Sequence, residues 1–304
     1  MRIILNILLA ITLLLTACNP VEKKKDKPIK IVCTTNILGD LVEVLAADQS
    51  TVVSLMGAGV DPHLYKATQG DLMELNSADV IIYNGLHLEG KMTEIFEKLS
   101  NRKNIIAATA GVDQRKLINN SDFKGAYDPH LWFDVKLWIE VIDYIAYQLS
   151  TIDGLNQELI NQNKEAYIKQ LQLLNEEVKS KISSIDKSQR VLITAHDAFA
   201  YFGRAYNIEV RGLQGISTLS EYGLMDVSEL VDFIVERKIK AVFVESSVSD
   251  RSLKAVVQGC RSKGHDVVIG GTLYSDALGE KGSNAGTYIE MVKHNVNTIV
   301  ENLR

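Results

Sequence analysis

One tripeptide that occurs twice carries the residues of this chain best suited to chemistry. The sequence Asp-Pro-His ends at His63 and again at His130, and these two copies use two of the four prolines in the chain. Each proline fixes the backbone directly before an imidazole side chain. For either copy alone, a turn that begins at Asp-Pro is a sufficient explanation. The repetition favours a shared functional role for the two histidines.

Two further residues lie where a strand is expected to end. His196 comes directly after a β-rich run at 191–194, and Asp276 follows the last β-rich run of the chain. The carboxyl ends of strands in open α/β sheets face the crevice where ligands bind. Alone, His196 is explained as a hydrogen-bonded histidine at a strand end, and Asp276 as a helix cap or turn former.

The four residues together favour a metal site. His63, His130, His196 and Asp276 each lie in a loop between regular elements, two in each half of the chain. Three imidazoles and one carboxylate suit a divalent transition ion, chiefly zinc, and manganese or iron less tightly. Four protein ligands leave no obvious vacant position on the ion. The set is therefore typical of a site that holds a metal rather than one that activates water.

Alternating strands and helices must position these residues. Short β-rich runs separated by helical stretches indicate βαβ units and hence parallel sheets. The expected strands form two groups, at 29–33, 51–55, 79–84 and 104–109, and at 191–194, 208–213, 241–245 and 266–270. The fold class is therefore α/β, with two doubly wound-like lobes that each contain a parallel sheet.

One long helix is expected to join the lobes. Residues 153–185 contain no proline and consist mostly of good helix formers, with apolar residues on one helical face. A continuous helix of this length would extend roughly 50 Å, which is longer than one lobe needs. A coiled-coil segment is the alternative, but its apolar seam would be short and irregular. We expect lobes at 29–152 and 186–304 with a rigid linking helix at 153–185.

The amino terminus has the pattern of a bacterial lipoprotein. Residues 1–17 combine an early arginine with an apolar run of signal-peptide length, and small residues precede Cys18. We expect cleavage before Cys18 and lipidation of its thiol, with residues 18–28 as a lysine-rich tether. The protein would then be anchored on the extracytoplasmic face of a cell membrane, periplasmic or at the cell surface. An ordinary signal peptide with an incidental cysteine is the alternative.

Composition limits the remaining classes of partner. The formal net charge of −5 and the absence of a basic stripe argue against binding to nucleic acid. The chain has three cysteines, so we expect no disulfide framework and expect Cys33 and Cys260 to be unpaired, buried side chains. We expect a monomer.

From residue 29 to its end, the sequence resembles the metal-binding receptors of bacterial zinc and manganese ABC importers, the TroA-like cluster. The matching segments are the two Asp-Pro-His tripeptides, the second continuing as Leu131-Trp132, then Asn84-Gly85-Leu86 with Leu88-Glu89-Gly90, the strand-end His196, and Leu273-Tyr274-Ser275-Asp276.

The resemblance implies a fold, a role and a set of ligands. Receptors of this family have two α/β lobes joined by one rigid helix, deliver metal to a membrane permease and are not enzymes. Their four ligands occupy the positions that match His63, His130, His196 and Asp276. Manganese-selective members commonly have a glutamate at the position of His196. Many zinc receptors of Gram-negative bacteria carry a histidine-rich loop before the second ligand, and residues 113–128 contain no histidine. The resemblance therefore leaves the metal open between zinc and manganese.

Two other function classes remain to be separated. A secreted zinc hydrolase would also need histidines and an acid, but it needs an open coordination position and a general base. No His-Glu-x-x-His pattern is present in the sequence. An adhesin would be compatible with a surface lipoprotein, although no residue pattern supports it. Of the remaining polar residues, we expect His87 to have a surface or packing role and Glu245 to hydrogen-bond a ligand imidazole.

Overall fold

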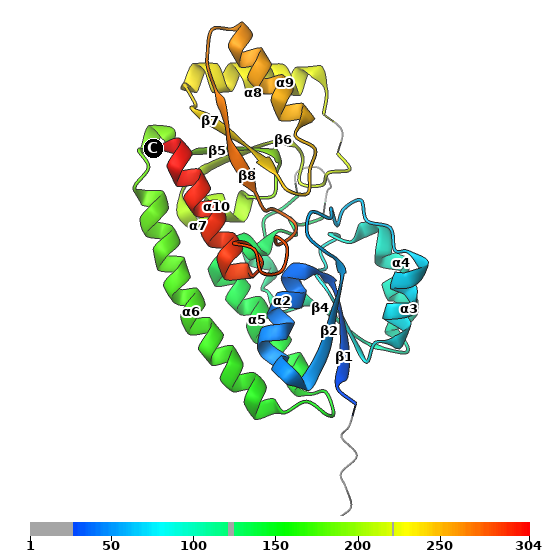
Figure 1. Cartoon of the computed structure of the whole chain (residues 1–304). Coiled ribbons are helices and arrows are strands. Elements are labelled where there is room, and N and C mark those ends of the chain that lie inside the picture. Colours follow the sequence, from blue (N-terminus) through cyan, green and yellow to red (C-terminus); the bar gives the residue numbers. More distant parts are fainter. Residues whose placement is uncertain (1–26, 121–124, 221) are drawn as a thin grey trace, which may run out of the picture.

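The computed structural model describes residues 27–120, 125–220 and 222–304. Residues 1–17 and Cys18, on which the lipoprotein prediction depends, lie outside this range. The described chain forms two α/β lobes, as expected, with a long helix along one flank of both (Figure 1).

The N-terminal lobe contains a four-stranded parallel sheet in the order β2-β1-β3-β4. Its strands are β1 (Ile29–Thr35), β2 (Ser50–Met56), β3 (Val80–Tyr83) and β4 (Asn104–Ala107). The helices of this half are α2 (Asn36–Ala46), α3 (Gln69–Ser77), α4 (Thr93–Ser100) and α5 (Val135–Ser150). The first group of expected strands is thus confirmed, because alternation of buried strands with helices is a local property of the sequence.

The C-terminal lobe contains two pairs of parallel strands, β5 with β6 and β7 with β8. β5 and β7 lie next to each other, but the described backbone ladder does not continue between them. The elements are β5 (Val191–His196), α7 (Ala200–Tyr206), β6 (Glu209–Gln214), α8 (Leu224–Arg237), β7 (Ala241–Glu245), α9 (Arg251–Ser262), β8 (Val268–Leu273) and α10 (Tyr288–Leu303).

The last strand begins and ends later than the sequence suggests. We expected 266–270, but β8 covers Val268–Leu273. A β-carbon on Gly270 would lie 2.9 Å from the β-carbon of Asn302 on α10, so the close approach of this helix requires glycine. The strand therefore continues through the glycines and delivers its carboxyl end to the site.

The long helix is shorter than expected. α6 covers Gln157–Ser183, 27 residues, which corresponds to about 40 Å. Gly154 has a φ of +94°, and the side chain of Asn156 accepts hydrogen bonds from the backbone N–H groups of Glu158 and Leu159, the second and third residues of the helix. This cap explains why the helix begins four residues later than 153.

α6 packs on elements of both lobes and is not their sole connection. It contacts α2 and α5 on one side of the boundary and α7 and α10 on the other. One hydrophobic cluster also runs through both lobes and includes Ile31 and Leu38 together with Phe243 and Tyr288. The stiffness of the connection thus comes from a shared core as well as from the helix.

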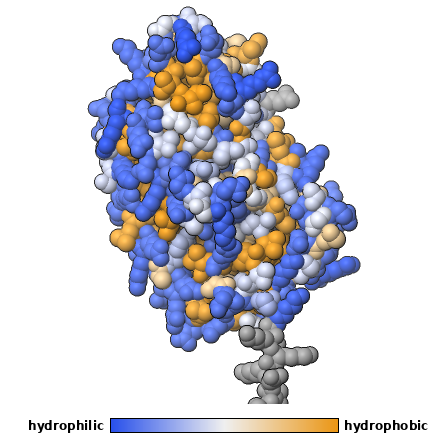
Figure 2. All heavy atoms as spheres, viewed as in Figure 1, coloured by the Kyte–Doolittle hydropathy of each residue, from blue (hydrophilic) through white to orange (hydrophobic). Residues whose placement is uncertain are grey.

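The described residues have neither a helix suited to crossing a membrane nor a disulfide between their cysteines. No helix there is both long and apolar enough to cross a bilayer. Polar residues cover most of the face shown in Figure 2, and apolar residues lie in separate patches. Cys33 and Cys260 are buried and free, as predicted.

Candidate metal centre

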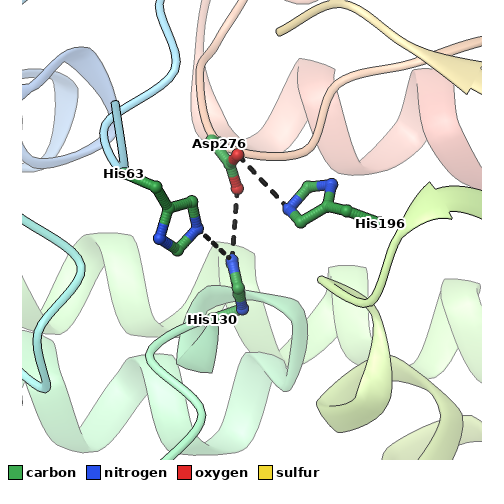
Figure 3. A group of neighbouring side chains, drawn as sticks. All are labelled: His63, His130, His196 and Asp276. Carbon is green, nitrogen blue, oxygen red and sulfur yellow. Dashed lines mark hydrogen bonds and ion pairs between the residues drawn. The ribbon is translucent and has the colours of Figure 1, made fainter. Parts of the chain in front are cut away.

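The four residues singled out in the sequence converge on one point between the lobes (Figure 3). His63, His130, His196 and Asp276 each offer one nitrogen or oxygen atom, and these atoms all lie within 4.8 Å of one another. All four side chains are buried. His63 follows β2, His130 lies shortly before α5, and the other two come from the ends of β5 and β8. His87 is exposed and is not part of this group.

The spacing of the atoms suits one shared ion. Nε2 of His63 lies 3.3 Å from Nε2 of His130. One oxygen of Asp276 lies 3.3 Å from Nε2 of His130, and the other lies 3.4 Å from Nε2 of His196. Neighbouring ligands about 2.0–2.1 Å from a tetrahedral ion are separated by about 3.3–3.4 Å. These three contacts therefore have the separation expected of ligands that share one metal ion.

The His130 ring is held by the aspartate of its own tripeptide. Oδ1 of Asp128 accepts a hydrogen bond from the backbone N–H of His130 at 2.9 Å and lies 2.7 Å from its Nδ1. Both side chains are fully buried. An Nδ1–H that donates to a carboxylate leaves the lone pair of Nε2 free to face the ion.

The His196 ring is held in the same way by a distant residue. Oε2 of Glu245, the last residue of β7, lies 2.6 Å from Nδ1 of His196, and Oε1 accepts from the backbone N–H of His196 at 2.9 Å. Glu245 thus lies against the His196 imidazole, as the sequence suggested, and its hydrogen bond of good geometry is the one to the backbone N–H. The side chain of Glu245, at the end of β7, thus bonds to the backbone at the end of β5, between the β5–β6 pair and the β7–β8 pair.

The His63 ring has a different environment. Oδ1 of Asp61 accepts from the backbone N–H groups of His63 and Leu64, at 2.8 and 3.4 Å. Within the described residues no carboxylate pairs with the His63 ring, whose recorded hydrogen-bonding contact is Nε2 of His130. Asp61 therefore stabilises the backbone of the turn, and the His63 imidazole contacts His130 instead of the aspartate of its own tripeptide.

Comparison with known proteins identifies the group to which this arrangement belongs. Residues 31–302 match the family model of ZnuA, the periplasmic component A of a zinc-uptake complex. The chain belongs to this family.

Relatives in the family are named for different metals. The chain is 48% identical over 295 residues to the manganese-binding lipoprotein MntA of Bacillus subtilis (strain 168), with 96% of each chain covered. It is 45% identical over 277 residues to the zinc-binding protein TroA of Treponema pallidum (strain Nichols), with 90% of this chain and 88% of TroA covered. The solved structure of that periplasmic zinc-binding protein superimposes with a TM-score of 0.88 at 42% identity and covers 91% of this chain and 99% of TroA.

In this member of the ZnuA family, burial and neighbouring charges shift the pKa values of the four site residues. Burial lowers the pKa of His130, but Asp128 and Asp276 outweigh burial and raise that pKa to about 9. Burial likewise opposes protonation of His196, while Glu245 and Asp276 raise its pKa well above the ordinary value. Burial raises the pKa of Asp276, but the two neighbouring histidines bring it well below its usual range. Burial is the main effect on His63, and it lowers the pKa of that ring to about 3.

Several buried atoms in and around the site make no hydrogen bond of good geometry within the described residues. They are Oδ1 of Asp276, Nε2 and Nδ1 of His196, Oε2 of Glu245 and Oδ2 of Asp128. Buried polar atoms are nearly always hydrogen-bonded or bound to an ion. A cation at the centre of the cluster would satisfy Oδ1 of Asp276 and Nε2 of His196.

Sequence reasoning missed what the aspartates of the two tripeptides do. Both were explained only as turn formers, yet Asp128 also pairs with a ligand ring and Asp61 also bonds across the lobe boundary to Thr218. An aspartate two residues before a candidate ligand histidine was a usable signal for the first role. No local signal connects Asp61 with Thr218, because 157 residues separate them.

Proposed function

We propose that this protein is an extracytoplasmic receptor that captures one divalent transition metal ion and delivers it to the permease of an ABC importer. The observation that carries the proposal is the convergence of three imidazoles and one carboxylate, which offer four ligand atoms within 4.8 Å of one another. Membership in the ZnuA family supports it, as do relatives named as substrate-binding lipoproteins of metal ABC transporters. The ligands are His63, His130, His196 and Asp276.

The family is one of solute-binding receptors, and we propose that this chain likewise has no enzymatic activity. The comparisons offer no support for the hydrolase alternative. Four side chains directed at one point would fill a tetrahedral ion and leave no position for an attacking water. Metal-dependent hydrolysis of ester and amide panels by the purified protein would contradict this proposal.

Metal binding to alanine variants tests the ligand set. One ion should bind per chain, and alanine at any one of the four ligand positions should weaken binding at least about tenfold. His87→Asn is a matched control, since it removes an exposed imidazole from a backbone with a φ of +65°, which asparagine tolerates. If His87→Asn weakened metal binding as much as His196→Ala does, the ligands would be assigned wrongly.

We propose that zinc displaces manganese from this site at equal free concentration. Zinc binds more tightly than manganese to most nitrogen and oxygen sites, and three neutral imidazoles reinforce that order. Competition titrations measure it directly, and a preference for manganese would overturn the proposal.

An exchange at His196 tests the reason for the preference. A glutamate there should favour manganese, but the single variant would place two carboxylates together, because His196 contacts Glu245 at 2.6 Å. His196→Glu combined with Glu245→Gln removes that repulsion and is the better test. The ratio of zinc to manganese affinity should fall in the double variant relative to Glu245→Gln alone.

We also propose that Cys18 carries the lipid and that the protein is a monomer on the membrane surface. Several relatives are named as lipoproteins. Cys18→Ala should release the protein from membranes or leave its signal peptide uncleaved. Normal processing with unchanged membrane retention would contradict the lipidation proposal, and sedimentation of the detergent-solubilised protein tests the monomer.

A further inference from the structure

One side of the lobe boundary is fastened by helix α2. Asn36, Asp40 and Glu43 lie on one face of this helix and bond to the chain segment 278–288, which follows Asp276. Oδ1 of Asn36 accepts from the N–H of Leu278, and Oδ2 of Asp40 accepts from the N–H of Tyr288, both at 2.9 Å. Glu43 completes the set through an ion pair with Lys281.

The residue directly before Asp276 is fastened as well. Nε1 of Trp132, two residues after His130, donates to the carbonyl of Ser275 at 2.9 Å. The hydroxyl of Tyr288 in turn donates to the carbonyl of Trp132 at 2.7 Å. Asp276 thus lies between two attachments to the N-terminal half of the molecule. Although Asp276 follows β8 of the C-terminal lobe, these hydrogen bonds attach it to the N-terminal half, which also carries His130.

The His63 turn is connected to the C-terminal lobe differently. Oδ2 of Asp61 accepts a hydrogen bond of 2.7 Å from the hydroxyl of Thr218, which lies between β6 and α8. The other oxygen of the same carboxylate holds the backbone N–H of His63. One carboxylate therefore joins the His63 turn to the opposite lobe, and the bond to Thr218 can exist only while the lobes are closed on this side.

We infer that Thr218 is a positioning residue for the ligand His63, acting through Asp61. While its hydroxyl is bonded, the His63 ring is held toward the ion. When the lobes separate on this side, the bond breaks and the turn is free to carry His63 away, while His130 and Asp276 stay together. Release of the metal then begins with His63. This inference rests on the proposed function and concerns the order in which that same site gives up its ion.

The rate of metal dissociation tests the inference. Zinc-loaded wild type, Thr218→Val and Thr218→Ser are mixed with excess chromogenic chelator in a stopped-flow instrument. Thr218→Val should release zinc about tenfold faster, the change expected on losing one hydrogen bond to a charged group. Thr218→Ser keeps the hydroxyl and should stay within about twofold of wild type. Thr151→Val removes a hydroxyl whose recorded bond is to the carbonyl of Gln148, far from the site, and should change nothing.

A second background separates positioning of His63 from a general effect on the fold. In a His63→Ala protein, Thr218→Val should change the zinc dissociation rate less than about twofold, because the residue through which it acts is gone. An equal acceleration in both backgrounds would overturn the inference, as would Thr218→Ser releasing zinc as fast as Thr218→Val, or Thr218→Val matching wild type. Failure of the proposed function is a distinct result, since the wild type would then take up no stoichiometric zinc.

Discussion

The two Asp-Pro-His turns have the same sequence and different physical roles. Oδ1 of Asp128 holds both the backbone N–H and the ring of His130, and the hydroxyl of Tyr201 in the C-terminal lobe donates to the carbonyl of Asp128. Asp61 holds only backbone N–H groups of its own turn, and its second oxygen accepts from Thr218. Asp128 orients an imidazole, whereas Asp61 orients a segment of chain.

The electrostatic consequence is that the pKa values of the two histidines are shifted in opposite directions when no metal is bound. The pKa of His130 is raised to about 9 and that of His63 is lowered to about 3. Near neutral pH, one ring is charged and ion-paired while the other is neutral. A repeated tripeptide therefore does not imply a repeated function, because the groups that surround each turn come from elsewhere in the chain.

Removal of each ring should give the largest contrast. In the metal-free protein, His130→Ala leaves the buried carboxylate of Asp128 without its imidazole partner and takes one of two histidines from Asp276, which should lower the free energy of unfolding by about 3–5 kcal/mol. His63→Ala should lower it less, by about 1–2 kcal/mol, since it leaves a cavity but no carboxylate in the described chain loses a partner. Chemical denaturation with chelator present measures both. If both variants lost the same free energy of unfolding, the proposed electrostatic difference between the two turns would be wrong.

Exchange of each carboxylate for an amide should give a smaller contrast. Asp128→Asn should weaken metal binding about 10- to 100-fold, as is typical when the partner of a ligand imidazole is lost. Asp61→Asn should weaken it less, about three- to tenfold, because asparagine still caps the backbone N–H groups of the turn but loses the charged oxygen that accepts from Thr218. Competition with a chelator of known affinity gives both values. A larger loss of affinity in Asp61→Asn than in Asp128→Asn would contradict the difference between the two carboxylates.

The pH dependence of the metal-free protein should give the smallest contrast. Because the folded pKa of His130 exceeds that of the unfolded chain, its ion pairs stabilise the fold fully below about pH 6.5 and are lost as the pH rises through about 9. We expect a fall of about 1–2 kcal/mol in the free energy of unfolding over this range.

His63→Ala supplies the control for this measurement. The variant should show the same fall as wild type, since a pKa of about 3 leaves His63 neutral across the whole range. Stability that does not change between about pH 6.5 and 9 would show that His130 is not ion-paired in the empty site.

Local features of the sequence determined the class of fold and the four candidate ligands. Strand and helix alternation is readable because burial imposes a period on neighbouring residues. The histidines stood out because proline or a strand end precedes each of them, and Asp276 because it follows the last strand. The contact of Glu245 with His196 was predictable because both residues end strands of the C-terminal lobe. The beginning of α6 was misjudged because the cap at Asn156 and the turn at Gly154 act on single residues within a helix-forming composition.

Only the tertiary structure decided how each ligand is held. Glu245 lies 49 residues from His196, and Thr218 lies 157 residues from Asp61, so no local pattern could pair them. The attachment of Asp276 to the body that carries His130 likewise depends on Trp132 and helix α2, which come much earlier in the chain. Hydrogen bonds and ion pairs act over a few ångströms in space regardless of separation along the chain. The candidate ligands could therefore be chosen from the sequence, while their charge, orientation and freedom to move are properties of the fold.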